Sequence, residues 1–298
     1  MSRSHGSDAC LALWAMLAVV ASGCTAISDL DRFEKADQAA AGGGAGSGGS
    51  GAEVGDLGCK NARTLCLRLA KFSPHRDELV QVDLVTNADN TLRTRAILDP
   101  LGAGEDTADI VLPLAIPENE VPRAGEDHPL HLEIFADDNK DGKYTLSDDH
   151  DWNVELPADG NLVYEHNSDF SALDPPPRGQ GADFTMTLTG MGVHKDKMLE
   201  VMVIQSLGKM QLGRTVGLYR IAAIQSDTID ITIPDIIDPG LSYVVEFYAD
   251  ANGDRNYDDP DTDHTWIERG ESGEDGFHVD FEHGTTFANL EYQFPFKK

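Results

Sequence analysis

Two stretches of the chain carry a dense set of side chains that could bind a cation. Residues 135–152 read FADDNKDGKYTLSDDHDW, and residues 248–266 read YADANGDRNYDDPDTDHTW. Aspartate and asparagine alternate in both, and each stretch ends with a histidine two residues before a tryptophan. Carboxylate and amide oxygens are hard ligands of the kind that calcium prefers, and carboxylates held close together repel one another unless a cation neutralises them. The pattern therefore predicts a calcium site in each stretch.

Both stretches resemble the calcium loop of EF-hand proteins, D-x-[DN]-x-[DN]-G. The resemblance implies that the ligands of the first loop are Asp137, Asn139, Asp141, the backbone carbonyl of Lys143, Thr145 and Asp148. The ligands implied for the second loop are Asp250, Asn252, Asp254, Asn256, Asp258 and Asp261. Arg255 stands where the first loop has Gly142, so the second loop departs from the pattern. The resemblance covers only the loop, about twelve residues, because the flanking segments alternate like strands. The alternative for both loops is a solvated turn rich in aspartate and asparagine.

Histidines provide a second candidate site. Six of the ten histidines recur in register, because His75, His150 and His166 correspond to His194, His264 and His283. Imidazole nitrogens favour zinc or copper, so these residues are the alternative, transition-metal site. They lack the short ligand spacing of motifs such as HxH or HExxH. The structural alternative is that they pack beside the two tryptophans or contact the loop carboxylates.

Enzyme motifs are absent from the sequence. The chain has no GxSxG elbow and no Walker A motif, and its glycine-rich run at residues 39–51 lacks the strand, lysine and helix of a phosphate loop. We therefore expect no enzymatic activity. Paired acids can hydrolyse glycosides, so a carbohydrate-binding or carbohydrate-active protein is a further alternative.

The elements that must position these residues occur twice in the chain. FSPHRDELVQVDLV (72–85) matches MGVHKDKMLEVMVI (191–204), and three further blocks match in the same order. Apolar residues alternate within the blocks, as in TLCLRL (64–69) and TIDITI (228–233), and this period of two predicts half-buried strands. About seven such runs in each copy predict an all-β fold of two tandem immunoglobulin-like or transthyretin-like β-sandwich domains.

The boundaries of the copies follow from composition. We expect the first repeat at residues 59–174, a proline-rich linker at 175–181 and the second repeat at 182–298. Three consecutive prolines at the junction favour an extended spacer. Residues 24–58, rich in glycine, alanine and serine, are expected to form a flexible tether.

The N-terminal segment resembles a bacterial lipoprotein signal. An apolar run at residues 10–21 ends in ASGC (21–24), which is similar to a lipobox. The resemblance implies a signal peptide at residues 1–23, lipidation of Cys24 and attachment to a membrane. Thr25 follows the cysteine, and lipoproteins without aspartate at that position usually reach the outer membrane.

Charge and cysteine content limit the partners and the compartment. The chain has 52 acidic and 23 basic residues, a formal charge of −29, so its surface repels phosphate backbones and we expect no nucleic acid partner. Cys59 and Cys66 are expected to form a structural disulfide in an oxidising compartment, the alternative being two reduced thiols. The sequence thus predicts a cell-envelope lipoprotein with calcium-stabilised domains that bind or scaffold; it does not identify a protein or glycan partner.

Overall fold

The computed structural model describes residues 57, 59, 63–102, 107–114, 121–123, 126–142, 144–145, 148–171, 181–206, 213–255 and 257–290. The predicted signal peptide, Cys24, Lys143 and Asn256 lie outside the described residues, as do the tether apart from Leu57 and the linker apart from Gly181. Residues Gly51–Lys298 form one compact unit. Among the described residues, no helix has the length and apolar character needed to cross a membrane.

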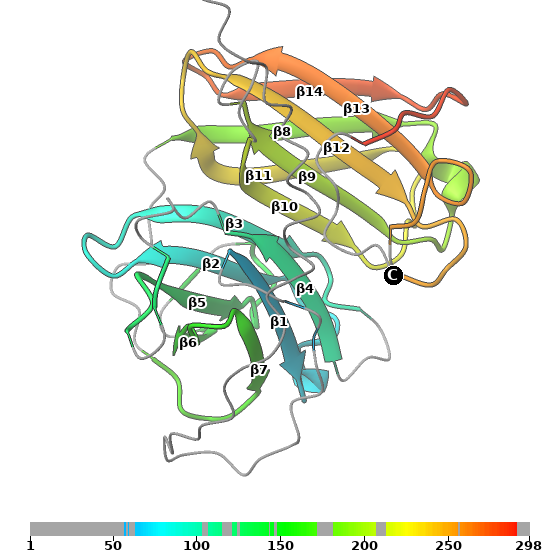
Figure 1. Ribbon diagram of the computed structural model, residues 1–298. Helices are drawn as coiled ribbons and strands as arrows, with labels where there is room; N and C mark the ends of the chain where they lie inside the picture. The colour runs from blue at the N-terminus through cyan, green and yellow to red at the C-terminus, as the bar shows by residue number, and fades with distance from the viewer. Residues whose placement is uncertain are drawn as a thin grey trace, which may run out of the picture. The chain divides into compact units, whose positions relative to one another are not determined.

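The first repeat consists of strands and one short 3-10 turn (Figure 1). Its elements are β1 (Thr64–Ala70), η2 (Ser73–His75), β2 (Val80–Thr86), β3 (Leu92–Leu98), β4 (Thr107–Pro113), β5 (Leu130–Ala136), β6 (His150–Glu155) and β7 (Asn161–Glu165). The alternation of Leu65, Leu67 and Leu69 in β1 places all three leucines in the core, as the period of two predicts.

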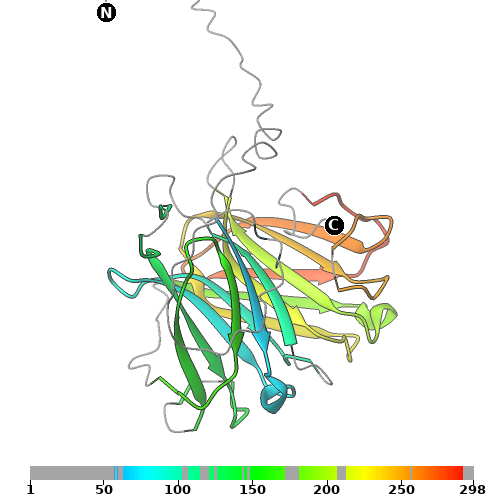
Figure 2. The same cartoon turned by 60° about the horizontal axis from the view of Figure 1, so that its bottom comes forward.

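The second repeat has the same elements in the same order. They are β8 (Ala182–Thr189), η4 (Met191–His194), β9 (Leu199–Gln205), β10 (Arg214–Ile221), β11 (Ile229–Ile237), β12 (Ser242–Ala249), β13 (His264–Glu271) and β14 (Phe277–Glu282). A second view shows the same composition of strands and connecting loops (Figure 2). The prediction of an all-β fold is therefore confirmed.

Each repeat is a sandwich of two layers. In the first repeat, a three-stranded sheet of order β4-β1-β7 faces strands of order β3-β2-β5-β6. In the second, the sheet β11-β8-β14 faces strands of order β10-β9-β12-β13. In both small sheets the last strand of the repeat runs parallel to the first, so the two ends of each repeat lie side by side.

The two repeats share one sheet. Strand β3 pairs in parallel with β10, which joins the two larger layers into eight strands of order β13-β12-β9-β10-β3-β2-β5-β6. The pairing brings Ala96 opposite Leu218 and Ile97 opposite Tyr219. The division into separate domains at residues 59–174 and 182–298 stays a prediction. The structure shows that the two repeats share one sheet.

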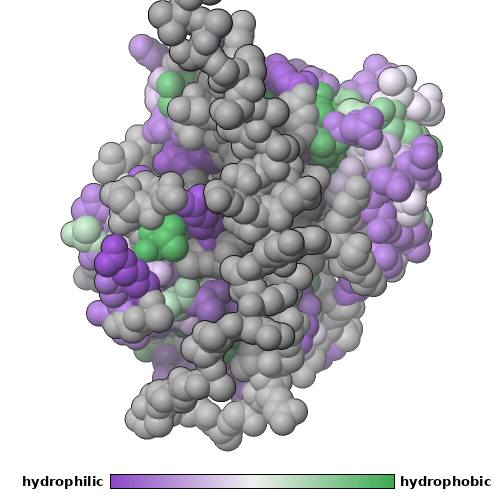
Figure 3. Space-filling view, viewed as in Figure 1, coloured by the Kyte–Doolittle hydropathy of each residue, from purple (hydrophilic) through white to green (hydrophobic). Residues whose placement is uncertain are grey.

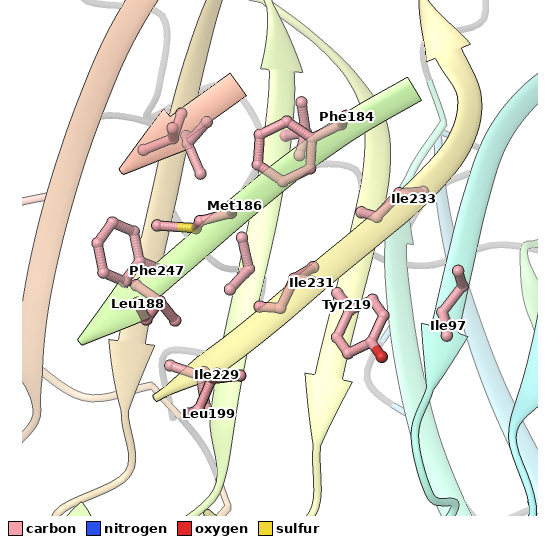
Figure 4. Packing of buried hydrophobic residues seen from close by; sticks show 14 of the residues in the cluster. Ile97, Phe184, Met186, Leu188, Leu199, Tyr219, Ile229, Ile231, Ile233 and Phe247 are labelled. Atoms are coloured by element: carbon pink, nitrogen blue, oxygen red, sulfur yellow. The ribbon is translucent and has the colours of Figure 1, made fainter. Parts of the chain in front are cut away.

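The parallel pairing of β3 with β10, called the join below, also divides side chains between two cores. Ala96 and Leu218 belong to the core of the first repeat, whereas Ile97 and Tyr219 belong to the core of the second (Figure 4). Because successive residues of a strand point to opposite faces, the two small sheets cover opposite faces of the shared sheet. Each repeat therefore contributes a residue to the hydrophobic core of the other.

Buried polar groups reinforce the join. The guanidinium of Arg95 donates to both carboxylate oxygens of Asp83 at 2.9 Å and, from Nη1, to the carbonyl oxygen of Pro234 at 2.9 Å. Tyr219 donates its hydroxyl proton to Asp99 of the first repeat at 2.5 Å. Removing one partner of such a buried group leaves the other unsatisfied, which costs about 1–3 kcal/mol or more when the group is charged.

Two features lie outside the join. Cys59 and Cys66 form a disulfide with a Cα–Cα distance of 5.6 Å, which fixes the start of the first repeat to β1.

On the face shown in Figure 3, the coloured surface is mostly hydrophilic, with small separate apolar areas. That surface agrees with the acidic composition of the chain.

Candidate metal centres

Three segments of the first repeat bring His75, His150 and His166 together. His75 ends the 3-10 turn η2, His150 is the first residue of β6, and His166 directly follows β7. The backbone amide of His166 donates to the carbonyl oxygen of Ala70 at 2.9 Å, which extends the parallel pairing of β7 with β1 by one bond. The two ends of the repeat thus hold the third histidine beside the first.

Ring nitrogens of the three residues lie within metal-binding reach. One ligand nitrogen from each histidine lies within 4.8 Å of the others. Nδ1 of His150 is 3.5 Å from Nε2 of His75, and the ring centroids of His75 and His166 are 4.9 Å apart. Nε2 of His166 is buried and has no hydrogen-bond partner among the described residues. A buried unsatisfied nitrogen is costly, and a bound metal ion would satisfy it.

The second repeat forms the same cluster from the same elements. His194 ends η4, His264 begins β13, and His283 directly follows β14 with its amide bonded to the carbonyl oxygen of Thr189 at 2.9 Å. Nε2 of His194 lies 3.1 Å from Nε2 of His283 and 3.5 Å from Nδ1 of His264. We call the two clusters centre 1 (His75, His150, His166) and centre 2 (His194, His264, His283).

The nitrogen spacing matches a tetrahedral metal site. Zinc binds histidine nitrogen at about 2.0–2.1 Å, so two nitrogens of a tetrahedral site are separated by about 3.3 Å. The closest separations in centre 2, 3.1 and 3.5 Å, lie on either side of this value. Three histidines leave the fourth position of a tetrahedron open, an arrangement that allows an exchangeable ligand.

Four of the six histidines have lowered pKa values, which favour the neutral form that metals require. Burial, together with the neighbouring His150, lowers the pKa of His75 to about 4. Burial, together with His264 and His283, lowers the pKa of His194 to about 4. Burial also lowers the pKa values of His166 and His264. A neutral imidazole has a free lone pair, so protons compete weakly with a metal ion at neutral pH.

Aromatic rings surround each centre in the same way. In centre 1, Phe170 stacks on His150 with centroids 4.1 Å apart, and Trp152 donates its indole N–H to the carbonyl oxygen of Asn167 at 3.2 Å. In centre 2, Phe287 stacks on His264 at 4.0 Å, and Trp266 donates to the carbonyl oxygen of Gly284 at 3.1 Å. These ring contacts and hydrogen bonds restrict the orientations of the histidine and tryptophan rings.

Centre 1 has additional acidic neighbours. Nδ1 of His75 lies 2.6 Å from a carboxylate oxygen of Glu78, and both residues lie within 4.8 Å of the Asp138 carboxylate. Burial first, and then the charge of Asp138, raises the pKa of Glu78 to about 7. Sequence reasoning missed Glu78 and Asp138, because neither recurs in the second repeat.

The first predicted calcium loop is closed by two buried carboxylates. Asp137 accepts the backbone amides of Asp141 at 3.1 Å and Gly142 at 2.8 Å. Asp149 accepts the amides of Asp138 at 3.1 Å and Thr145 at 2.6 Å, and its burial raises its pKa. Sequence reasoning placed Asp137 among the ligands but assigned Asp148 rather than Asp149; the structure buries Asp149 and leaves Asp148 exposed.

The second loop repeats this closure. Asp250 accepts the amides of Gly253 at 2.7 Å and Arg255 at 2.9 Å, and buried Asp263 accepts those of Ala251 at 3.0 Å and Asp258 at 2.8 Å. Arg255 takes the left-handed φ of 66° that Gly142 adopts at 74° in the first loop. The arginine therefore makes the same turn despite its side chain.

The structure gathers the histidines more closely than the carboxylates that are predicted to bind calcium. Among the described residues, the groups of three or more histidine, cysteine or acidic side chains with ligand atoms within 4.8 Å are centre 1, centre 2 and the His75–Glu78–Asp138 group. The predicted ligands Asn139, Asp141, Asp148, Asn252, Asp254 and Asp261 are exposed, and Thr145 and Asp258 are half-buried. Binding of calcium by these loops stays a prediction.

Comparisons with known proteins do not assign a family. No protein-family model matches the chain, and no curated protein matches it. A leucine-rich repeat protein from Bacteroides thetaiotaomicron is similar at 12% sequence identity with a TM-score of 0.17. That match covers 74% of this chain and 26% of the other protein, and with so low a TM-score it indicates neither fold nor function for this chain.

Proposed function

We propose that this protein binds a transition-metal ion, zinc or copper, at each of its two three-histidine centres. The supporting observation is that both repeats place three histidines from the same three elements with ligand nitrogens within 4.8 Å. Metal binding accounts for three imidazoles held together around one buried histidine in each repeat, and for the unsatisfied Nε2 of His166 in centre 1. Histidine sites generally bind copper(II) more strongly than zinc, so the amount of each metal in the compartment would decide which ion occupies the centres.

The proposed location is the cell envelope. Support comes from the sequence resemblance of residues 21–24 to a lipobox, which implies a lipid on Cys24. The disulfide between Cys59 and Cys66 fits an oxidising compartment. A tethered protein with open metal positions suits capture or delivery of metal ions at the outer membrane, a binding rather than an enzymatic role.

We further propose that each repeat is a transthyretin-like sandwich. A constant-type immunoglobulin domain groups its first, second, fifth and fourth strands in one sheet. Here the first strand of each repeat lies with the fourth and seventh, and the second lies with the third, fifth and sixth. The sheet order therefore favours the transthyretin-like alternative of the two that the sequence predicts.

Elemental analysis and metal titration test the proposed function. The purified protein should bind two zinc or copper(II) ions per chain, one per centre. His75→Ala and His194→Ala should each remove one ion, and the double variant should remove both. His278→Ala is the matched control, because His278 is an exposed histidine of β14 outside both centres. Unchanged stoichiometry in the double variant, or no zinc or copper bound by the folded wild-type protein, would refute the proposal.

A further inference from the structure

The two centres differ at the residue that lies three positions after the first histidine. Glu78 follows His75 by three residues, and Lys197 follows His194 by three residues. Both turns close with the same backbone bond, because the amide of Glu78 donates to the carbonyl oxygen of His75 at 3.1 Å and that of Lys197 donates to His194 at 3.0 Å. The residues between differ in conformation, since ψ is −32° at Arg76 and 140° at Lys195. The repeats therefore place an acid and a base at equivalent positions beside equivalent histidines.

Glu78 contacts the ring nitrogen of His75 opposite to the one that lies beside His150. Its carboxylate lies 2.6 Å from Nδ1 of His75, while Nε2 of the same ring lies 3.5 Å from His150. A carboxylate on one nitrogen fixes the ring orientation and the tautomer, and it increases the basicity of the nitrogen that binds the metal. Both side chains are buried, with exposed fractions of 1% for His75 and 8% for Glu78, so solvent screens the contact little.

A second difference also gives centre 1 the more negative surroundings. Asp138 lies in the acidic group of centre 1, and its equivalent in the second repeat is Ala251. The ammonium of Lys197 instead lies at the second loop, 3.6 Å from the position that a Cβ on Gly253 would occupy. Centre 1 thus has two carboxylates as neighbours, whereas centre 2 has neither of them at the equivalent positions.

We propose that the two centres are unequal: centre 1 is a tight site for divalent ions in which Glu78 positions His75, and centre 2 is a weaker site because Lys197 replaces that carboxylate. This inference rests on the proposed function. Coulomb energy scales with the charge of the ion, so the added carboxylates favour zinc(II) and copper(II) over copper(I) in centre 1. Centre 2 discriminates less between the two charge states. The protein would therefore fill centre 1 first and exchange metal through centre 2.

Variants that leave one centre intact allow each affinity to be measured in the full chain. His264→Ala with His283→Ala leaves centre 1, and His150→Ala with His166→Ala leaves centre 2. Zinc is titrated into each in competition with a chromophoric chelator. We expect centre 1 to bind zinc at least about tenfold more tightly, and Glu78→Gln to weaken it about 10–100-fold, the usual effect of removing such a carboxylate. Asp77→Asn is the matched control, because it removes one charge from an exposed residue of the same turn.

The reciprocal change is made in centre 2. Lys197→Glu should strengthen zinc binding there about tenfold or more, and Lys197→Gln should have a smaller effect because it removes charge without supplying a carboxylate. These variants keep the test decisive if Glu78→Gln fails to fold. Glu78→Asp should restore part of the affinity of centre 1, and the electron paramagnetic resonance spectrum of copper(II) bound at centre 1 should change in Glu78→Gln but not in Asp77→Asn.

The outcomes separate this inference from the proposed function. If neither centre binds metal, the proposed function fails. If both bind zinc with equal affinity and neither Glu78→Gln nor Lys197→Glu changes it, only the inequality is refuted. If the wild-type protein binds three ions and Glu78→Gln removes one of them, Glu78 is a direct ligand and its positioning role is refuted.

Discussion

Nε2 of His194 lies 3.1 Å from Nε2 of His283, although 89 positions separate the two residues in the chain. The contact exists because β14 pairs in parallel with β8, so the end of the repeat returns beside its beginning. In the first repeat, β7 and β1 make the same pairing and bring His166 to His75. Each centre is therefore a consequence of how its sandwich closes.

The shared sheet predicts that the two repeats unfold together. Ile97→Ala should destabilise the second repeat by about 2–5 kcal/mol although Ile97 lies in the first, because its side chain packs in the core of the second. Trp266 reports the second repeat in a Trp152→Phe background, and Trp152 reports the first in a Trp266→Phe background. Urea unfolding should give coincident transitions for both reporters, and Ile97→Ala should shift both.

Val193→Ala is the control for this experiment, because Val193 is 72% exposed and its truncation should change stability by less than about 0.5 kcal/mol. Two separate transitions, with only the Trp152 transition shifted by Ile97→Ala, would show that the repeats are independent domains. That result would support the modular organisation predicted from the sequence alone.

His128 should make folding stability depend on pH. It is 5% exposed, and burial lowers its pKa below the value of about 6.5 for an unfolded chain. As pH falls below about 6.5, the unfolded chain takes up this proton first, so stability is lost toward the folded pKa and is fully present above 6.5. His128→Asn removes the titration and can keep an acceptor for the amide of Leu130, which donates to Nδ1 at 3.1 Å.

Urea unfolding with a metal chelator, at about pH 7.5 and pH 5.5, measures this effect as the difference between wild type and variant. The wild-type protein should lose more stability than His128→Asn over this range, by about 1.4 kcal/mol for each unit of pKa difference reached within it. His278→Asn, at an exposed histidine, should follow the wild type. Parallel losses in wild type and His128→Asn would contradict the prediction.

Gly142 is favoured by its backbone conformation rather than by lack of space. Its φ is +74°, and a Cβ built on it meets no atom within 4 Å. Gly142→Ala should therefore destabilise the fold by about 1 kcal/mol through strain alone. Gly284→Ala, which also has an open surrounding but no left-handed φ, should change the free energy of unfolding by less than about 0.5 kcal/mol. Equal effects of the two substitutions in thermal unfolding would rule out strain at Gly142.

Calcium binding by the acidic loops can be separated from metal binding by the histidines. If an extracellular-type loop binds calcium with Kd of about 10⁻⁴–10⁻³ M, millimolar calcium adds about 0.4–1.4 kcal/mol per site. Asp137→Asn and Asp250→Asn should each remove part of the calcium-dependent rise in melting temperature while keeping one acceptor oxygen for the loop amides. His75→Ala should leave that rise intact. Superimposable melting curves with chelator and with calcium would show that both loops are solvated turns that do not bind calcium.

The proposed lipid anchor depends on Cys24. Cys24→Ser should abolish incorporation of labelled fatty acid and shift the protein out of the membrane fraction, because serine cannot form the thioether. Cys10→Ser, inside the predicted signal peptide, is the control and should leave labelling unchanged. Retained labelling in Cys24→Ser would disprove lipidation at this residue.

The sequence by itself determined the strand content, the duplication and the histidines that correspond between the copies. Alternating leucines in β1 predict a half-buried strand because side chains of a strand point alternately to two faces. Correspondence of His75 with His194 follows from alignment of the repeats. Neither pattern shows that the three histidines of a copy lie within ligand distance of one another. The residues are far apart in the chain, and alternation does not specify which strands pair.

Only the tertiary structure decided the centres and the join. Parallel pairing of the first and last strands places the third histidine, and this long-range contact leaves no local pattern. Pairing of β3 with β10 buries both faces of β3, so that Ala96 and Ile97 enter different cores. A strand covered on both faces loses its alternation, and LEVMVIQ in β9 is buried at every residue. The contact of Glu78 with His75 likewise depends on how the turn after η2 folds, so sequence comparison could show an acid opposite a lysine but not what the acid touches.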